Sequence, residues 1–402
     1  MSLSSTPSFA PLRLKKNEER RLRAGHLWVY SNEVDTAVTP LAGFEPGQPV
    51  EVQAHNGKPL GTGYINPHSL ICARLVSRDP AHPLSDSLLV HRLKVALGLR
   101  ERLYPGPFYR LVHGEGDGLP GLIVDRFGDV VVVQITTAGM ERMKDGVIAA
   151  LDKVLKPVGI LLRNDTASRK LEELDSYVEP IGQVPEVIEL SENGVRHLAP
   201  LLGGQKTGWF YDQQDNRARM FKYVRGARVL DVFSYVGGWG IQAAMHGAES
   251  VMCIDSSAPA LEHAHAAAEL NGIAERFSSL EGDAFEALKA LRQERERFDV
   301  IVCDPPAFVK RRKDFKEGAL AYRRINELAM SLLERDGILI SCSCSHHMAR
   351  ESLAETLLAA SRHLDRSLVF LEQGRQGPDH PVPPAIPETE YLKAFFSRVL
   401  PA

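Results

Sequence analysis

Short apolar runs alternate with amphipathic segments along the second half of the chain. The run at 228–233 is followed by three glycines within four residues and then by an amphipathic segment. A buried strand, a tight turn and a helix in this order are typical of a nucleotide-binding βαβ unit. The same pattern predicts strands at 250–254, 278–280, 298–303 and 337–341 and helices at 258–271, 318–333 and 350–363. Together with a terminal hairpin at 368–372 and 391–399, these elements predict a doubly wound α/β sheet of seven strands with an antiparallel last strand.

Polar residues follow these predicted strands where such sheets bind ligands. Gly237, the first glycine of the turn, allows close approach of a ligand to the backbone. Asp255 ends the next run at the spacing of about 20 residues at which a carboxylate binds ribose hydroxyls. Asp283 follows the 278–280 run and is placed to meet an adenine amino group. The strand at 298–303 leads into Asp304-Pro305-Pro306-Ala307-Phe308, and a nucleotide site followed by this motif predicts a methyltransferase that uses S-adenosylmethionine and acts on a planar nitrogenous group.

The first 80 residues have a different pattern. Strands predicted at 28–30, 49–54, 60–65 and 70–76, separated by glycine and proline turns, indicate a small β-barrel. A basic run precedes them, with Arg13, Lys15, Lys16, Arg20, Arg21 and Arg23 against only two glutamates. Such runs are usually solvated helix faces, but the glycine and aromatic strand that follow resemble the start of a PUA domain, a small RNA-binding barrel.

The middle of the chain predicts a small α+β domain without chemistry of its own. A proline-containing linker at 79–83 is followed by a helix at 84–104 and by two strands within 108–135, around a glycine-rich turn at 114–121 and with a second turn at 127–129. A helix at 141–155 and a strand at 158–163 follow. A hairpin with an Asn-Gly turn is predicted at 187–198. The expected domains are therefore a barrel at 1–79, a middle domain at 84–190 and a methyltransferase domain at 191–402.

The composition bears on what the protein can bind and on where it works. A net charge of −3 indicates no general affinity for nucleic acid, so any RNA-binding surface has to be local. The chain has five cysteines and no secretory pattern, which suits reduced thiols in the cytoplasm, and it contains no apolar run of membrane-spanning length. The sequence leaves the oligomeric state open, with a homodimer as one arrangement.

Several motifs resemble those of the PUA-containing class I methyltransferases that methylate carbon 5 of cytosine in large-subunit ribosomal RNA. The matching stretches are GHLWVYSNEV, GEGDGLPGLIVDRFG, QKTGWFYDQQDNR, VLDVFSYVGGWG, DPPAFVK and SCSCS, in the family's order. The resemblance implies S-adenosylmethionine as cofactor, large-subunit ribosomal RNA as partner and Cys344 as the catalytic cysteine. It also implies a loop at 205–212 over the cofactor and cofactor contacts from Tyr211, Asp212, Gln213, Phe233, Ser234, Tyr235, Gly237, Asp255, Ser256, Asp283, Ala284, Asp304 and Pro305.

The chemistry of carbon 5 supports this interpretation independently. That carbon attacks a sulfonium methyl only after a thiolate has added to carbon 6 of the ring. Cys342 and Cys344 share a face of an extended segment, and Cys344 lies nearer the mouth of the strand, so we predict Cys344 as the nucleophile. Asp304 is predicted as the acid near ring nitrogen 3 and Phe308 as a stacking surface for the flipped base. The basic residues predicted to bind RNA phosphates are Arg20, Arg21, Arg23, Lys310, Arg311 and Arg312.

Two alternatives remain open at this point. The Asp-Pro-Pro-x-aromatic motif is also typical of enzymes that methylate base nitrogens without a thiol. A catalytically inert RNA-binding or ribosome-assembly factor is a second alternative, which binding of S-adenosylmethionine would argue against. A phosphate loop at Lys206-Thr207 and a dehydrogenase are disfavoured because the required glycine spacings are not present. Zinc is disfavoured because Cys342, Cys344, His346 and His347 are poorly spaced for tetrahedral ligation.

Overall fold

In the computed structural model, which describes residues 9–402, the chain divides into two units. The first unit contains the residues up to 186 together with 205–207 and 378–389. The second unit contains residues 187–204, 208–377 and 390–402. Within residues 9–402, no helix is both long and apolar enough to cross a membrane.

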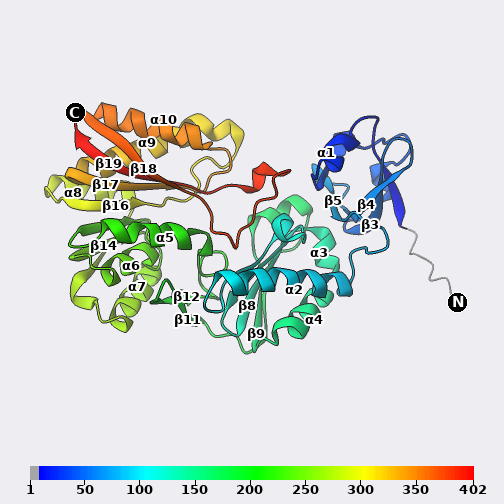
Figure 1. The fold of residues 1–402 in the computed structure, drawn as a ribbon, viewed down its shortest axis with the longest axis horizontal. Helices are drawn as coiled ribbons and strands as arrows, with labels where there is room; N and C mark the ends of the chain where they lie inside the picture. The colour runs from blue at the N-terminus through cyan, green and yellow to red at the C-terminus, as the bar shows by residue number, and fades with distance from the viewer. Residues whose placement is uncertain (1–8) are drawn as a thin grey trace. The chain divides into compact units, whose positions relative to one another are not determined.

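The N-terminal sheet of the first unit has five strands in the order β1-β3-β4-β5-β2 (Figure 1). Its strands are β1 (Ala10–Arg13), β2 (Trp28–Tyr30), β3 (Gln48–Gln53), β4 (Pro59–Ile65) and β5 (Ile71–Ser77). The four predicted strands are confirmed, whereas β1, which pairs parallel with β3, was not predicted. The basic run is helical only in α1 (Glu19–Arg23).

The second sheet of this unit has the order β10-β9-β8-β7-β6. Its strands are β6 (Phe108–His113), β7 (Leu122–Phe127), β8 (Val130–Ile135), β9 (Gly159–Asn164) and β10 (Tyr177–Gly182). The prediction of two strands within 108–135 is wrong, because there are three. The predicted turn at 127–129 is tight, with Gly128 at a φ of +65°, and the chain reverses there to form a separate strand. The helix predicted at 141–155 is present as α3 (Ala138–Arg142) and α4 (Lys144–Leu155), and α4 packs beside α2 (Asp86–Leu103).

Glu172 joins these two sheets within the first unit. Its side chain is buried and accepts hydrogen bonds from the Asn66 amide at 2.9 Å and from the Arg74 guanidinium at 2.9 Å. It also accepts from the backbone N–H of Ala138 at 3.3 Å. A buried carboxylate requires such partners, so the N-terminal sheet is fixed against the sheet that follows it.

The second unit is built on a seven-stranded sheet in the order β15-β14-β13-β16-β17-β19-β18 (Figure 1). Its strands are β13 (Arg228–Val232), β14 (Ser250–Asp255), β15 (Phe277–Glu281), β16 (Phe298–Cys303), β17 (Leu333–Ser343), β18 (Arg366–Gly374) and β19 (Lys393–Pro401). The first five are parallel, and β19 runs antiparallel to both of its neighbours. The predicted fold class is therefore confirmed.

Helices cover both faces of this sheet because its strands are apolar on both sides. Leu230 and Val232 of β13 pack in one core with α8 (Ala284–Gln293), α9 (Phe315–Leu332) and α10 (Arg350–His363). Val229, on the other face, packs with α6 (Gly238–Met245), α7 (Ala258–Leu270) and the end of α5 (Gln214–Met220). Figure 1 shows α9 and α10 on one side of the sheet and α6 and α7 on the other. The predicted hairpin is also present, as β11 (Val187–Glu192) and β12 (Val195–Pro200).

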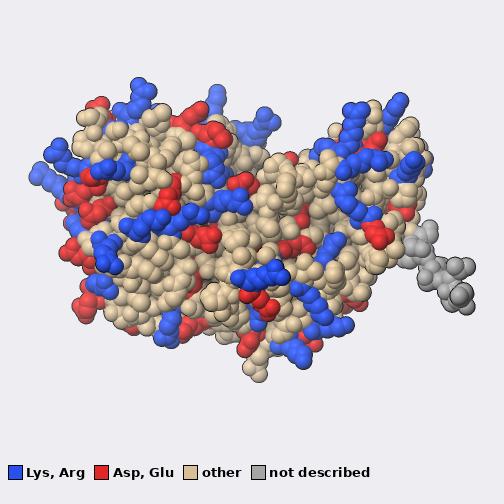
Figure 2. All heavy atoms as spheres, viewed as in Figure 1, with Lys and Arg blue, Asp and Glu red and all other residues tan. Residues whose placement is uncertain are grey.

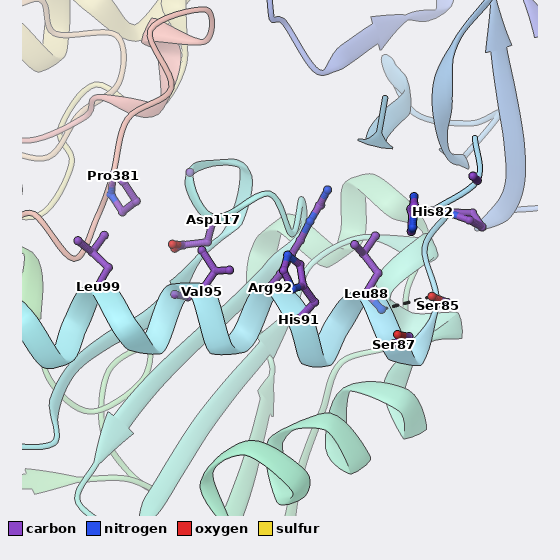
Figure 3. A pocket seen from close by; sticks show the side chains of 14 residues that line it. His82, Ser85, Ser87, Leu88, His91, Arg92, Val95, Leu99, Asp117 and Pro381 are labelled. Carbon is purple, nitrogen blue, oxygen red and sulfur yellow. Dashed lines mark hydrogen bonds between the residues drawn. The ribbon is translucent and has the colours of Figure 1, made fainter. Parts of the chain in front are cut away.

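A hollow of about 970 Å³ lies beside α2 in the first unit (Figure 3). Val95 and Leu99 of α2 face it, together with Asp117 and Pro381 from two loops. All of its lining residues belong to the first unit, and none of them is a predicted site residue.

Candidate active site

Five loops of the second unit follow the carboxyl ends of five neighbouring parallel strands. Val232 is in register with Ile254 and with Cys303, so the residues that follow these three strands lie at one level of the sheet. The predicted site residues stand at these ends: Phe233 to Gly237 after β13, Asp255 at the end of β14, Asp283 after β15, Asp304 after β16 and Cys344 after β17. Ligands of open α/β sheets bind at this edge.

The turn after β13 has an unusual backbone. Phe233, Tyr235 and Gly237 have φ angles of +66°, +50° and +76°, which place two non-glycine residues in the left-handed region. Such residues cost about 1–3 kcal/mol each and persist where the surroundings enforce them, typically at ligand sites. A Cβ on Gly240 would lie 2.6 Å from the sulfur of Cys253, so glycine is required for α6 to approach β14.

Asp255 connects this turn to the neighbouring strand. Its Oδ2 accepts a hydrogen bond from the backbone N–H of Tyr235 at 2.8 Å, and its Oδ1 accepts from that of Ser257 at 3.0 Å. Ser256, which lies between Asp255 and Ser257 in the sequence, is exposed. The Asp255 carboxylate therefore organises both loops at the position where a ribose-binding group is expected.

Asp283 has a local role that the sequence interpretation did not include. It is the N-cap of α8, and its Oδ1 accepts from the backbone N–H groups of Phe285 at 2.9 Å and Glu286 at 3.2 Å. Ala284, the first residue of that helix, is buried. Capping fixes the carboxylate at the edge of the sheet, next to β14.

The Asp304 carboxylate at the end of β16 is held by two side-chain hydrogen bonds. Its Oδ2 accepts hydrogen bonds from Gln213 Nε2 at 2.9 Å and from Trp239 Nε1 at 3.1 Å. Burial raises the pKa of Asp304 to about 6, and the two hydrogen bonds oppose this shift while the charge of Asp212 adds to it. Protonation of this carboxyl is therefore accessible near neutral pH.

The stretch that follows β12 packs its polar groups inward. Tyr211, Asp212 and Gln213 are all buried. Asp212 Oδ2 accepts a hydrogen bond of 2.6 Å from the hydroxyl of Tyr391, and its carbonyl accepts from Gly377 N–H at 3.0 Å. Residues 205–207 of the predicted cofactor loop group with the first unit.

Glu192 anchors this stretch from the hairpin. Arg217 donates two hydrogen bonds to its carboxylate, at 2.6 and 2.9 Å, and Trp209 Nε1 donates a third at 2.9 Å. All three side chains are buried, so each charge is compensated by its partner. Removal of Glu192 would leave a buried guanidinium without a counter-charge.

The cysteines differ sharply in accessibility. Cys344 is partly exposed, whereas Cys72, Cys253, Cys303 and Cys342 are buried. The sulfur of Cys344 lies 3.9 Å from the carbonyl oxygen of Pro305, which places it beside the Asp-Pro-Pro segment. Cys342 lies inside β17, and burial raises the pKa of its thiol well above the ordinary value. The two thiols, which share a face by spacing, are thus not equivalent.

The predicted RNA-binding residues of this unit lie mainly at the surface. Lys310, Arg311 and Arg312 are exposed, and Arg311 forms a 2.8 Å ion pair with Asp314. A hollow of about 680 Å³ lies next to them, lined by Arg312, Lys313, Phe315, Lys316 and His347. Phe308 is half-buried, with its ring 4.9 Å from that of Tyr322.

The predicted arginines of α1, next to the N-terminal sheet in the sequence, have different environments. Arg20 and Arg23 are exposed, whereas Arg21 is partly buried and forms a 2.6 Å ion pair with Glu33. Figure 2 shows Lys and Arg side chains gathered on the part of the first unit that contains α1, whereas charges of both signs are mixed on the visible face of the second unit.

Sequence reasoning missed four residues of this site: Glu192, Trp239, Tyr322 and Lys393. Trp239 stands between two glycines of the turn motif, and Lys393 is a charged residue directly before the apolar run Ala394 to Phe396 at the start of β19. Both exceptions to the local pattern were visible signals. Glu192 and Tyr322 have no such signal, because their partners are distant in the sequence.

The acceptor groups at this edge fit a cationic nucleoside. The carboxylates of Asp255, Asp283 and Asp304 stand at the carboxyl ends of β14, β15 and β16, where they can accept hydrogen bonds from hydroxyl and amino groups and stabilise a positive charge. Within residues 9–402, no group of three or more His, Cys, Asp or Glu side chains is arranged to hold a metal ion. The fold and this edge define a class I methyltransferase that uses S-adenosylmethionine.

Comparison with known proteins identifies the family. Residues 12–78 match the PUA-like domain, and residues 168–398 match the S-adenosylmethionine-dependent methyltransferase family. A protein from Salmonella arizonae named ribosomal RNA large subunit methyltransferase I is 37% identical over 407 residues, and the match covers 100% of both chains. The protein of the same name from Salmonella gallinarum is also 37% identical over the same length. The chain therefore belongs to the family of S-adenosylmethionine-dependent methyltransferases that carry an N-terminal PUA-like domain.

Solved structures share the fold. A putative S-adenosylmethionine-dependent methyltransferase from Streptococcus mutans superimposes with a TM-score of 0.81 at 21% identity, over 97% of this chain and 100% of that one. A putative methyltransferase complexed with S-adenosylhomocysteine gives a TM-score of 0.83, also at 21% identity and with the same coverage.

Proposed function

We propose that this enzyme methylates carbon 5 of a cytosine in large-subunit ribosomal RNA, with Cys344 as the nucleophile. The relatives from Salmonella are named for large-subunit ribosomal RNA, and they match the chain over its whole length. A ribosomal RNA substrate also implies that the enzyme works in the cytoplasm.

One observation carries the choice of carbon 5. Cys344 is the one cysteine of the five that is partly exposed, and its sulfur lies 3.9 Å from the carbonyl of Pro305, next to Asp304. Methylation of a base nitrogen needs no thiol at this position. Addition to carbon 6 of a pyrimidine requires a thiol there.

The proposed reaction assigns a role to each of these groups. The thiolate of Cys344 adds to carbon 6, while the Asp304 carboxyl donates a hydrogen bond or proton to ring nitrogen 3. Bound S-adenosylmethionine would supply an electrophilic methyl group for carbon 5, with S-adenosylhomocysteine as the leaving group. Removal of the proton from carbon 5 by a base then expels the Cys344 thiolate and restores the aromatic ring, and any proton on ring nitrogen 3 returns to Asp304. The raised pKa of Asp304, about 6, suits a group that acts as an acid in this scheme.

The surrounding surface supports an RNA substrate. The 680 Å³ hollow offers the cations of Arg312, Lys313 and Lys316 to phosphate groups, and it contains the ring of Phe315. In the first unit, Arg20 and Arg23 of α1 are exposed cations that can contact phosphates as well. We therefore propose RNA contacts in both units.

A second candidate reaction is methylation of a base nitrogen. It is favoured by Asp304-Pro305-Pro306, because the carboxylate and the adjacent carbonyls can orient an amino group. In that reaction Cys344 would be dispensable, which separates the two candidates experimentally.

Mass-spectrometric mapping of ribosomal RNA from cells with and without this gene tests the proposal. Loss of a single 5-methylcytidine from the large-subunit RNA is expected, and reintroduction of the Cys344→Ala variant should not restore it. Loss of an N-methylated base, or restoration by Cys344→Ala, would favour the second candidate.

A further inference from the structure

Lys393 is a buried cation next to the proposed nucleophile. It is 5% exposed and lies in β19, directly opposite Ser343 of β17. Its Nζ donates hydrogen bonds to the carbonyl oxygens of Ser345, at 2.6 Å, and Tyr391, at 2.8 Å. A buried ammonium is unfavourable unless it is compensated, so a lysine among apolar neighbours needs an explanation.

The two neighbours of Cys344 are both held by side chains of the same unit. The hydroxyl of Tyr322 lies 2.9 Å from the Ser343 hydroxyl and 2.9 Å from the Ser345 hydroxyl. The Ser345 hydroxyl also accepts from the backbone N–H of Val309, at 3.2 Å, in the segment after Asp-Pro-Pro. Lys393 completes this arrangement by holding the Ser345 carbonyl, so the backbone on each side of Cys344 is fixed.

The thiolate form of Cys344 requires a nearby positive charge for its stabilisation. The carbonyl oxygen of Pro305, 3.9 Å from the sulfur, accepts from the S–H group and thereby favours the neutral thiol. A cation near the sulfur favours the thiolate, which is the reactive form. The charge of Lys393 interacts with Cys344. Two other charges act on Lys393, those of Arg350 and Glu390, and they offset each other because the two side chains form a 3.6 Å ion pair.

Lys393 is protonated at neutral pH despite its burial. Burial lowers the pKa of Lys393 from its ordinary value to about 8, while the interaction with Cys344 opposes this decrease. Below that pH the ammonium form predominates, so the positive charge is present under physiological conditions.

We propose that Lys393 is a positioning residue for the nucleophile: it holds the Ser345 carbonyl, and its charge stabilises the thiolate of Cys344. This inference rests on the proposed role of Cys344. Its test does not require methyl transfer, so failure of the proposed function and failure of this inference give different results.

The test measures the rate at which iodoacetamide alkylates the native protein at a series of pH values. Because the other four cysteines are buried, the reaction reports the thiolate of Cys344. Lys393→Met should shift the pH midpoint of alkylation upward by about one unit, which corresponds to an approximately tenfold lower rate at neutral pH. Lys393→Arg, which keeps the charge, should stay close to the wild type.

Two further variants serve as controls, one for the charge of Lys393 and one for its position. Lys393→Gln keeps N–H donors without the charge, so an upward shift equal to that of Lys393→Met assigns the effect to charge. Lys289→Met removes an exposed lysine of the same unit that pairs with Glu286, and it should leave the profile unchanged. Calorimetric titration with S-adenosylmethionine identifies which variants are folded. A folded Lys393→Met or Lys393→Gln protein with the wild-type alkylation profile would overturn the proposal.

Discussion

Gln213 Nε2 donates a 2.9 Å hydrogen bond to Oδ2 of Asp304 and thereby connects the loop after β12 to the end of β16. The orientation of this amide is fixed, because Asn216 Nδ2 donates to Gln213 Oε1 at 2.7 Å. Trp239 donates to the same carboxylate oxygen. Both side chains donate to Oδ2, so neither of them occupies the other carboxylate oxygen of Asp304.

The Gln213→Leu substitution should change the pH dependence of the reaction. The hydrogen bond from Gln213 lowers the pKa of Asp304, which burial raises to about 6, so its loss should raise that pKa further. If protonated Asp304 acts on the base, activity falls as the pH rises through the pKa of Asp304, and in the variant this fall moves to higher pH. Single-turnover rates at a series of pH values measure this shift. Gln293→Leu, at an exposed position of α8, is the control, and superimposable profiles for Gln213→Leu and wild type would exclude the acid role.

Substitution of the two neighbouring cysteines should have opposite effects. RNA with 5-fluorocytidine at the target position should trap a covalent adduct, because fluorine prevents the final proton removal. The adduct should persist in Cys342→Ala and disappear in Cys344→Ala, because the Cys342 thiol is fully buried. Denaturing electrophoresis of labelled RNA detects the adduct. A peptide map that placed the RNA on Cys342 would contradict the assignment.

The Asp255→Ala substitution should weaken binding of S-adenosylmethionine at least tenfold. Hydrogen bonds to a charged group contribute about 1.5–3 kcal/mol each, and the carboxylate also holds the N–H groups of Tyr235 and Ser257. Isothermal titration calorimetry measures the affinity. Asp299→Asn removes a carboxylate that accepts from Arg228 N–H at the opposite end of the same sheet, and it should leave the affinity unchanged. Wild-type affinity in Asp255→Ala would remove Asp255 from the cofactor site.

The succession of strands and helices along this half of the chain, and the position of each polar residue at the end of its strand, were predictable from the sequence. Asp255 and Asp304 each follow an apolar run, and parallel strands bring such ends to one edge. Contacts between segments distant in the sequence were not predictable. Gln213 and Asp304 are 91 residues apart, and no local pattern indicates their hydrogen bond.

The difference between the two neighbouring thiols followed from their positions along the strand. Cys344 was placed nearer the mouth of the strand than Cys342, and β17 ends at Ser343, so that Cys342 is enclosed and Cys344 is partly exposed. The parallel pairing of β1 with β3 was missed because a four-residue strand carries too little alternation to be recognised. The turn at 127–129 was predicted, but the short strand on its far side was not counted separately, so three strands stand where two were expected.

Neutralisation of Arg20 and Arg23 should reduce the salt dependence of RNA binding. Each phosphate contact that is lost lowers the slope of log affinity against log salt by about 0.7–0.9. Both side chains are exposed, whereas Arg21 pairs with Glu33 and lies over the ring of Tyr30, so its substitution would also disturb the sheet. Filter binding at several salt concentrations measures the slope. Lys58→Gln, an exposed charge before β4, serves as the control, and an unchanged slope in the double variant would place the RNA elsewhere.

The Asp231→Asn substitution should change how the stability of the second unit depends on pH. Asp231 is fully buried in β13, where its Oδ2 accepts from Gly240 N–H at 2.9 Å, and burial raises its pKa to about 7. Because the folded state binds this proton more tightly than the unfolded state, the stabilisation is complete below about pH 4 and is lost as the pH rises through 7. Asparagine keeps an acceptor for Gly240 without a charge. Relative to wild type, the variant should therefore gain about 1 kcal/mol of unfolding free energy per pH unit between about pH 5 and 7.

Urea denaturation monitored by tryptophan fluorescence at three pH values within this window measures the difference for Asp231→Asn. Asp336→Asn is the matched control, because the exposed Asp336 pairs with Arg398 and its pKa is lowered by that hydrogen bond. The stabilisation from Asp336 is present above its unfolded pKa and is lost only as the pH falls to acid values, so its variant should run parallel to wild type between about pH 5 and 7. If Asp231→Asn also ran parallel to wild type, the buried carboxyl would not titrate in this range. The pKa of Asp231 in the folded protein would then lie outside this range.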